Sequence, residues 1–333
     1  LREFQRVYDL LDIRFDSWDG EFYHAQFIDD LLVELEEKNL LIKDEGAMII
    51  PLDDDMPPAI IVKSNGSSTY LTRDVATALY RKRTYDFVEN LYGVGSQQSL
   101  HFKLLINVID KMGYDCADEI KHIAFGMISL AEGTMSTRSG NVVFLEDGLN
   151  NAINKPNNIM DERNPALDTR DEVAKQVGIG AVKFQELLNN RVKDYVFSWD
   201  EILNFDGETG PYVQYTAARA WSVMTRAEKE LDLEPFESLG FKHLNLSEEH
   251  SVIRQLYEFP QIVSAAQKKK EPSLITRHLV EIAKAFNKFY GQASILNAET
   301  KELALERYAI VKATRQVLEI GLGLLGIASP EKM

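Results

Sequence analysis

A loop rich in hydroxyl groups is the strongest candidate for phosphate contacts in this chain of 333 residues. The loop Gly133 to Asn141 holds serine and threonine side chains, is flanked by glycines, and carries one cation, Arg138. Backbone N–H groups in a glycine-bounded turn can form an anion nest, to which hydroxyl donors and a guanidinium add. The same composition is typical of a polar hairpin turn, so the loop alone does not decide between a binding site and a turn.

Two further polar groups follow expected strands. Tyr70 and Asp74 stand at one step from a strand into a helix, and Gln98 stands at the next. Ligands of open parallel sheets bind outside the carboxyl ends of the strands, where such residues gather. Asp74 is equally suited to capping its own helix and to pairing with a guanidinium. Gln98 is equally suited to binding a ligand and to facing solvent.

Apolar spacing predicts the elements that position these groups. We expect an amphipathic helix over Phe27 to Asn39 and an extended segment over Met48 to Leu52. We expect strands at Ile60–Val62, Asn90–Val94 and Ile120–Phe125. A further strand is expected at Thr69–Leu71, after a turn at Asn65-Gly66. Helices are expected at Arg73–Arg83 and Gln97–Met112. Strands that alternate with helices indicate a doubly wound parallel sheet of the Rossmann type.

Beyond about Asp168 the strand signals stop and long amphipathic helices replace them. The expected helices are Asp171–Asn190, Pro211–Leu231, Glu248–Lys268, Pro272–Leu296 and Glu299–Leu325. The sequence therefore predicts an α/β region followed by an all-helical bundle.

Composition narrows the class of protein. The formal net charge of −15 disfavours indiscriminate nucleic-acid binding, so a nucleic-acid contact must be a local patch, and DNA is not an expected partner. The single cysteine, Cys116, forms no internal disulfide, which fits the reducing cytosol. No Cys/His group has zinc spacing, and no apolar run has membrane length.

One expected helix presents a face suited to RNA. Tyr212, Tyr215 and Arg219 share that face with Arg226, while apolar residues such as Ala217 lie nearer the other. Exposed tyrosines stack unpaired bases and arginines bind phosphates. The alternative is that both tyrosines belong to the core. A second polar helix, expected to line the same groove, carries Arg277, Lys284, Asn287, Lys288 and Tyr290.

Several motifs in a fixed order resemble those of arginyl-tRNA synthetases, which are class I enzymes. The motifs are Tyr70–Asp74, Ser96–His101, His122–Met127, Met135–Asn141, Gly207–Tyr215 and the terminal residues Leu325–Met333. The resemblance covers essentially the whole chain. It implies activation of arginine by ATP, with magnesium as the counter-ion of the nucleotide, and transfer of the arginyl group to tRNA-Arg.

The resemblance also implies roles for residues. Tyr70, Asp74 and Gln98 match the arginine pocket. The ATP side matches His101, Gly126, Met127, Met135, Ser136, Thr137, Arg138 and Ser139. The family's residues that contact the anticodon match Tyr212, Tyr215 and Met333 in this sequence. We expect Arg219, Asn287 and Tyr290 to contact the tRNA as well. The expected segments are an insertion region (1–58), half of the nucleotide fold (59–167), a stem-contact segment (168–206) and the anticodon-binding domain (207–333).

This sequence departs from the family pattern in two places. The signature Lys-Met-Ser-Lys-Ser reads Thr134 to Arg138 here, so both lysines are absent and stabilisation of pyrophosphate charge is weakened. The His-Ile-Gly-His type motif of the first half of the fold is absent from these residues. Because the chain also opens without methionine, we expect a C-terminal fragment of a cytoplasmic, monomeric enzyme that is inactive alone.

Two alternatives to a fragment of a working enzyme follow. A tRNA-binding or regulatory module that has lost catalysis would also lack the histidine motif. A generic Rossmann-type nucleotide enzyme would explain the strands and leave the helical half unexplained.

Overall fold

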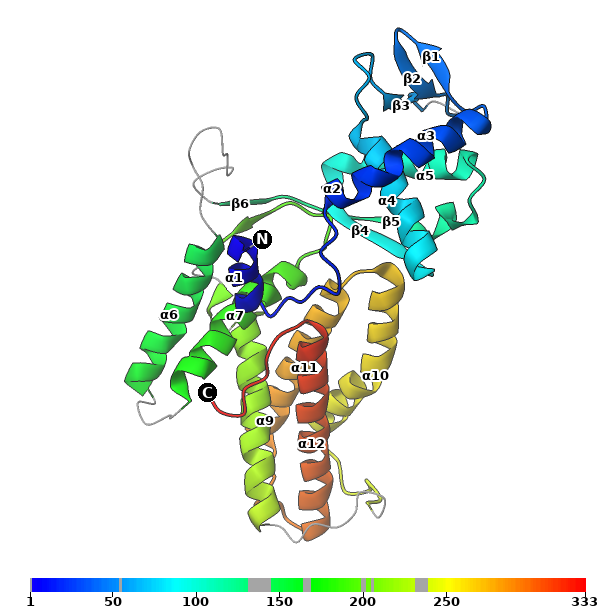
Figure 1. The fold of residues 1–333 in the computed structure, drawn as a ribbon. Coiled ribbons are helices and arrows are strands. Elements are labelled where there is room, and N and C mark those ends of the chain that lie inside the picture. Colours follow the sequence, from blue (N-terminus) through cyan, green and yellow to red (C-terminus); the bar gives the residue numbers. More distant parts are fainter. Residues whose placement is uncertain are drawn as a thin grey trace. The chain divides into compact units, whose positions relative to one another are not determined.

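The computed structural model describes residues 2–53, 56–130, 145–163, 169–198, 202–204, 207–230 and 239–333. The chain forms two compact units. One unit is Phe15–Met127, and the other combines Leu1–Arg14 with Ile128–Met333 (Figure 1).

The unit Phe15–Met127 combines helices with two small sheets. Its helices are α2 (Glu21–His24), α3 (Ile28–Glu37), α4 (Tyr70–Tyr85) and α5 (Ser99–Lys111), with short 3₁₀ turns at Ala25–Phe27, Ser96–Gln98 and Asp115–Glu119. Its strands are β1 (Ile42–Asp44), β2 (Ala47–Ile50), β3 (Ala59–Val62), β4 (Asn90–Gly95) and β5 (Ile120–Phe125). The predicted strand over Ile120–Phe125 is confirmed residue for residue.

The pairing of these strands corrects one prediction. The strands β4 and β5 are parallel, from Asn90 opposite Ile120 to Gly95 opposite Phe125, as a doubly wound fold requires. The strand β3, which we expected in the same sheet, pairs antiparallel with β2 instead. A short connection between β2 and β3 permits an antiparallel neighbour, whereas a parallel one needs a long crossover.

The predicted strand over Thr69–Leu71 is wrong. Thr69 is the N-cap of α4, and its Oγ1 accepts a hydrogen bond from the backbone N–H of Thr72 at 3.3 Å. A single bridge between Val62 and Ser68 is what remains of the expected hairpin. The capping preference of threonine outweighs its strand preference here, so α4 begins three residues earlier than predicted.

Helices α4 and α5 pack their apolar faces into one core. From α4 the core takes Val75, Ala78 and Leu79, and from α5 it takes Leu105, Val108 and Ile109. On these helices Asp74 and His101 remain only partly buried. The packing therefore fixes the two backbones while leaving polar side chains at the edge of the core.

The second unit is mainly helical. Its helices are α1 (Arg2–Leu10), α6 (Leu145–Arg163), α7 (Arg170–Leu188), α9 (Gly210–Glu230), α10 (Ser247–Lys269), α11 (Ser273–Gln292) and α12 (Lys301–Leu324). The five helices predicted after Asp168 correspond to α7 and α9–α12. Helices α9, α11 and α12 contact one another and run side by side in Figure 1.

Several elements of this unit were not predicted, among them β7 (Tyr195–Phe197) and α6. The short strand β7 pairs parallel with β6 (Ile128–Leu130), although we expected no strand after Asp168. Three residues are too few to show an alternating pattern. Helix α6 was missed because Pro156 lies inside it, and proline normally ends a helical pattern.

Buried polar contacts tie the bundle together. The guanidinium of Arg307 donates to Glu249 at 2.6 Å, and the other Glu249 oxygen accepts the N–H groups of Asn245 and Leu246 before α10. The side-chain amide of Gln214 donates to the carbonyl of Ala328 at 2.9 Å. Because charged and amide groups this deeply buried need partners, these contacts fix the position of the loops and of the C-terminal tail.

No helix within the described ranges is long and apolar enough to cross a membrane.

Candidate functional site

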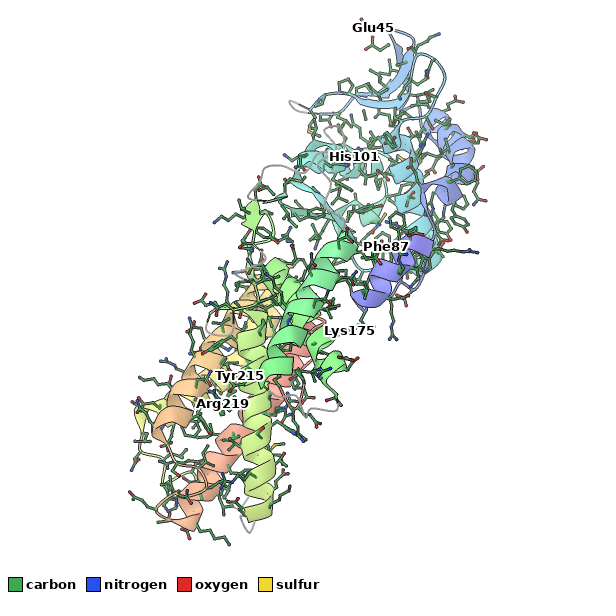
Figure 2. All side chains as sticks on the ribbon, turned by 90° about the vertical axis from the view of Figure 1, so that its left-hand side faces the viewer. Glu45, Phe87, His101, Lys175, Tyr215 and Arg219 are labelled. Carbon is green, nitrogen blue, oxygen red and sulfur yellow. The ribbon has the colours of Figure 1, made fainter. Side chains whose placement is uncertain are left out.

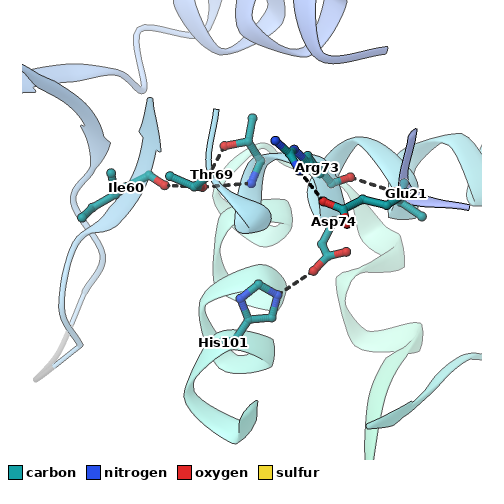
Figure 3. A network of polar contacts seen from close by, with 8 residues as sticks. Glu21, Ile60, Thr69, Arg73, Asp74 and His101 are labelled. Carbon is teal, nitrogen blue, oxygen red and sulfur yellow. Dashed lines mark hydrogen bonds and ion pairs between the residues drawn. The ribbon is translucent and has the colours of Figure 1, made fainter. Parts of the chain in front are cut away.

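Asp74 and His101 form the central contact of the candidate site. Asp74 lies in the second turn of α4, and His101 lies in the first turn of α5. The imidazole Nε2 is 2.6 Å from Oδ2 of Asp74 (Figure 3), and the side chains are 22% and 35% exposed respectively. An ionised carboxylate only accepts hydrogen bonds, so the imidazole is the donor. The imidazole thereby holds one oxygen of the Asp74 carboxylate, and the partly exposed carboxylate stays open to a ligand.

The neighbouring cation, Arg73, is directed away from Asp74. Its guanidinium donates to Glu21 on α2 at 2.5 Å (Figure 3), and this hydrogen bond holds the pKa of Arg73 above its ordinary value. The same guanidinium lies 5.5 Å from the ring centre of Tyr70, which begins α4 and is 70% exposed. Within the described residues, Asp74 is bonded to no lysine or arginine. Its negative charge is therefore available to a cation from outside the chain.

Gln98 and Gly126 follow neighbouring strand ends. Gln98 ends the 3₁₀ turn that follows β4, and Gly126 follows β5 directly. Since Gly95 lies opposite Phe125 in this parallel pair, the two segments leave the sheet at the same edge. Gln98 and Met127 are exposed. The predicted ATP loop, Met135 to Ser139, lies outside the described residues.

The tyrosines predicted to contact RNA meet on facing surfaces of α9 and α11. Tyr215 and Arg219 are one turn apart on α9 (Figure 2). The guanidinium carbon of Arg219 lies 4.8 Å from the ring centre of Tyr215 and 5.4 Å from that of Tyr290 on α11. Tyr215 is 41% exposed and Tyr290 is 42% exposed. The cluster therefore presents two aromatic rings to solvent, with a half-buried cation beside them.

Asn287 joins this cluster to the interior. Its side-chain oxygen accepts a hydrogen bond from Arg219 at 2.5 Å. Its amide nitrogen donates to the hydroxyl of Tyr212 at 3.1 Å and to that of Thr216 at 2.9 Å. The structure thus brings Tyr212, Tyr215 and Arg219 of α9 together with Asn287 and Tyr290 of α11, the second helix that the sequence analysis expected to line the same groove. We call these five residues the α9–α11 cluster.

Tyr212 and Tyr215 differ in how deeply they are buried. Tyr212 is half-buried against the bundle core, so its alternative as a core residue is partly correct. For Tyr215 the core alternative is wrong, because two fifths of its surface reaches solvent. Nearby cations are already paired: Lys284 with Glu208 at 2.6 Å and Lys288 with Glu248 at 3.2 Å.

Met333 packs against Val173, Ala174 and Val177 of α7. Its described contacts are therefore with α7. No group of three or more His, Cys, Asp or Glu side chains that could hold a metal ion occurs in the part of the chain that the structure describes.

Comparisons with known proteins identify the family of this chain. A model of the catalytic domain of class I tRNA synthetases (R) matches residues 1–199, and a model of the DALR anticodon binding domain matches residues 213–333. This chain belongs to the arginyl-tRNA synthetase family. The predicted fold class, an α/β catalytic region followed by a helical anticodon-binding domain, is confirmed.

Curated members of this family align with the entire chain. The arginine–tRNA ligase of Halothermothrix orenii is 50% identical over 337 residues, which include 100% of this chain and 58% of that protein. That of Clostridioides difficile is 51% identical over 334 residues, with the same two shares. The chain thus spans 58% of the length of these arginyl-tRNA synthetase relatives.

Solved structures of arginyl-tRNA synthetases show the same fold. The Thermus thermophilus enzyme superposes with a TM-score of 0.88 at 24% identity, over 99% of this chain and 62% of the other. The Plasmodium falciparum enzyme superposes with a TM-score of 0.82 at 23% identity, over 100% of this chain and 56% of the other.

Proposed function

We propose that this chain supplies the arginine pocket and the anticodon-binding surface of an arginine–tRNA ligase. Arginine and ATP would give arginyl-adenylate and pyrophosphate, and the arginyl group would then pass to tRNA-Arg. The observation that carries the proposal is the carboxylate of Asp74, which is held on one side by His101 and bonded to no lysine or arginine in the described residues. A guanidinium pairs with such a carboxylate through two parallel hydrogen bonds.

The arginine pocket in this proposal is Tyr70, Asp74 and Gln98. Tyr70 lies one turn before Asp74 on α4, so both side chains lie on one side of the helix. Gln98 stands at the edge of the sheet from which α5 begins. The three residues offer one anion, one ring and one amide, which suits a charged planar group better than an apolar side chain.

The ATP side would comprise His101, Gly126, Met127 and the segment Met135 to Ser139. Magnesium would enter as the counter-ion of the nucleotide. With threonine at positions 134 and 137, Arg138 is the one cation within this segment to meet the phosphates. The ligase is proposed to be cytoplasmic and monomeric, with segments 1–58, 59–167, 168–206 and 207–333 as insertion region, nucleotide fold, stem contact and anticodon-binding domain.

The tRNA surface in this proposal is the α9–α11 cluster together with Met333. Two exposed rings beside a guanidinium suit the stacking of unpaired bases and the binding of phosphate. The net charge of −15 favours such a local surface over a broad basic one.

A second candidate is a tRNA-binding or regulatory module without catalysis. Such a module would also lack the His-Ile-Gly-His type motif, which these residues do not contain. Both candidates keep the α9–α11 cluster and predict tRNA binding. They differ in whether arginine is transferred.

Arginylation assays on two proteins separate these candidates. We expect the 333-residue chain alone to bind tRNA-Arg and to form no arginyl-tRNA, because the histidine motif is missing. The full-length protein that contains it should form arginyl-tRNA with ATP. Full-length protein that binds tRNA-Arg without charging it would contradict the ligase and support the module. Charging by the chain alone would show that the histidine motif is dispensable and would contradict our expectation of an inactive fragment.

A further inference from the structure

We infer that His101 is a positioning residue for arginine, because its imidazole fixes the carboxylate of Asp74 in the orientation that receives the guanidinium. The inference rests on the proposed arginine pocket and deepens it. The motif places His101 on the ATP side, whereas its side-chain hydrogen bond in this structure is to Asp74, at 2.6 Å. This contact joins α4 to α5 within one unit.

Asp74 needs such a partner because little else in its surroundings restricts it. About a third of its side chain reaches solvent. Arg73, the adjacent cation, is engaged with Glu21. A short side chain at a helix surface exchanges between staggered rotamers unless a contact selects one. The imidazole selects one rotamer, and because each carboxylate oxygen has two acceptor sites, it leaves Oδ1 and one site on Oδ2 for a ligand.

His101 is itself held by the core. Its ring meets the ring of Phe102 edge-on, with centres 5.3 Å apart. Phe102 is buried and stacks on His122 with centres 4.5 Å apart. The Nε2 of His122 lies 2.9 Å from the carbonyl oxygen of Val94 on β4. A chain of packed rings therefore runs from the parallel strands to the imidazole that meets Asp74.

The benefit to binding comes from preorganisation. A carboxylate that is already ordered loses less conformational freedom when the guanidinium binds, and a correctly aimed carboxylate forms both hydrogen bonds at once. A ligand that makes no contact with Asp74 gains nothing from this order. His101 should thus act on arginine through Asp74, separately from any contact that it makes with ATP.

The test uses the full-length protein in arginine-dependent pyrophosphate exchange with tRNA present. His101→Ala should raise the KM for arginine about tenfold, which is the order expected for releasing one side chain and losing one charge-assisted hydrogen bond. His101→Gln should restore most of the affinity, because its amide nitrogen reaches a similar distance and also donates. Lys103→Ala, an exposed change on the same helix, serves as the matched control and should leave the KM unchanged.

A double-mutant cycle then shows whether His101 affects arginine binding through Asp74. In the Asp74→Asn background, His101→Ala should add less than twofold to the KM for arginine. The inference is overturned if His101→Ala changes only the KM for ATP, or if its effect on arginine is the same in both backgrounds. Thermal unfolding of each variant shows whether folding is retained. If Asp74→Asn itself leaves the KM for arginine unchanged, the proposed pocket fails. If only His101→Ala is silent, the inference alone fails.

Discussion

Replacing Asp74 with asparagine in the full-length protein is expected to raise the KM for arginine about 100-fold, with a change of less than threefold in the KM for ATP. The carboxylate is the one acidic group of the proposed pocket, and hydrogen bonds to charged groups contribute about 1.5–3 kcal/mol each. Each 1.4 kcal/mol corresponds to about tenfold in affinity. Asparagine keeps the shape of the side chain, removes its charge, and places an amide donor where the guanidinium also donates.

The measurement is arginine-dependent pyrophosphate exchange with tRNA present. Glu45→Gln is a suitable control, since Glu45 is an exposed acid at the turn between β1 and β2 in the same unit. It removes one negative charge without touching the pocket and should leave both KM values unchanged. An unchanged KM for arginine in the Asp74 variant would refute the pocket assignment.

Replacing Tyr215 with alanine should weaken binding of tRNA-Arg by about 10- to 100-fold. Stacking of a base on an aromatic ring contributes about 1–3 kcal/mol, and Tyr215 presents its ring to solvent beside Arg219. The change also removes one of the two rings that flank this guanidinium, so Arg219 loses part of its order. A filter-binding or fluorescence titration at a fixed salt concentration measures the Kd.

Tyr257→Ala provides the matched control for this loss. Tyr257 is on α10 of the same unit and is 75% exposed, yet it lies outside the α9–α11 cluster. Its removal should leave the Kd unchanged. The Tyr215 variant should lose more affinity for tRNA-Arg than for a tRNA with another anticodon. Equal losses for both tRNAs would point to a role in folding rather than in recognition.

The helices were the most predictable part of the fold. Long amphipathic stretches such as Glu248–Lys268 carry the apolar period over many turns, and α10 extends from Ser247 to Lys269. Short elements were not predictable in this way. The propensity of Thr69 favours a strand, but in the structure Thr69 caps helix α4. The strand Tyr195–Phe197 is too short to show an alternating apolar pattern.

The candidate sites also have a part that the sequence predicted and a part that it did not. Motifs identified Asp74 and Tyr215 as residues of interest, because their neighbours in sequence carry the family pattern. Motifs did not reveal that His101 meets Asp74 or that Arg219 lies between Tyr215 and Tyr290. These contacts depend on how α4 packs on α5 and how α9 packs on α11. Side-chain spacing along one helix carries no information about the register of two helices.

The central claim is that Asp74 selects a guanidinium, and a comparison of arginine with citrulline tests it most directly. Citrulline has nearly the shape of arginine but carries no charge, so it forms no ion pair with the carboxylate. In pyrophosphate exchange by the full-length protein with tRNA present, we predict that kcat/KM for citrulline is lower by about 10⁴, because a site built for a charged partner rejects the analogue that lacks it. Equal values for the two amino acids, or no exchange with arginine, would contradict the account.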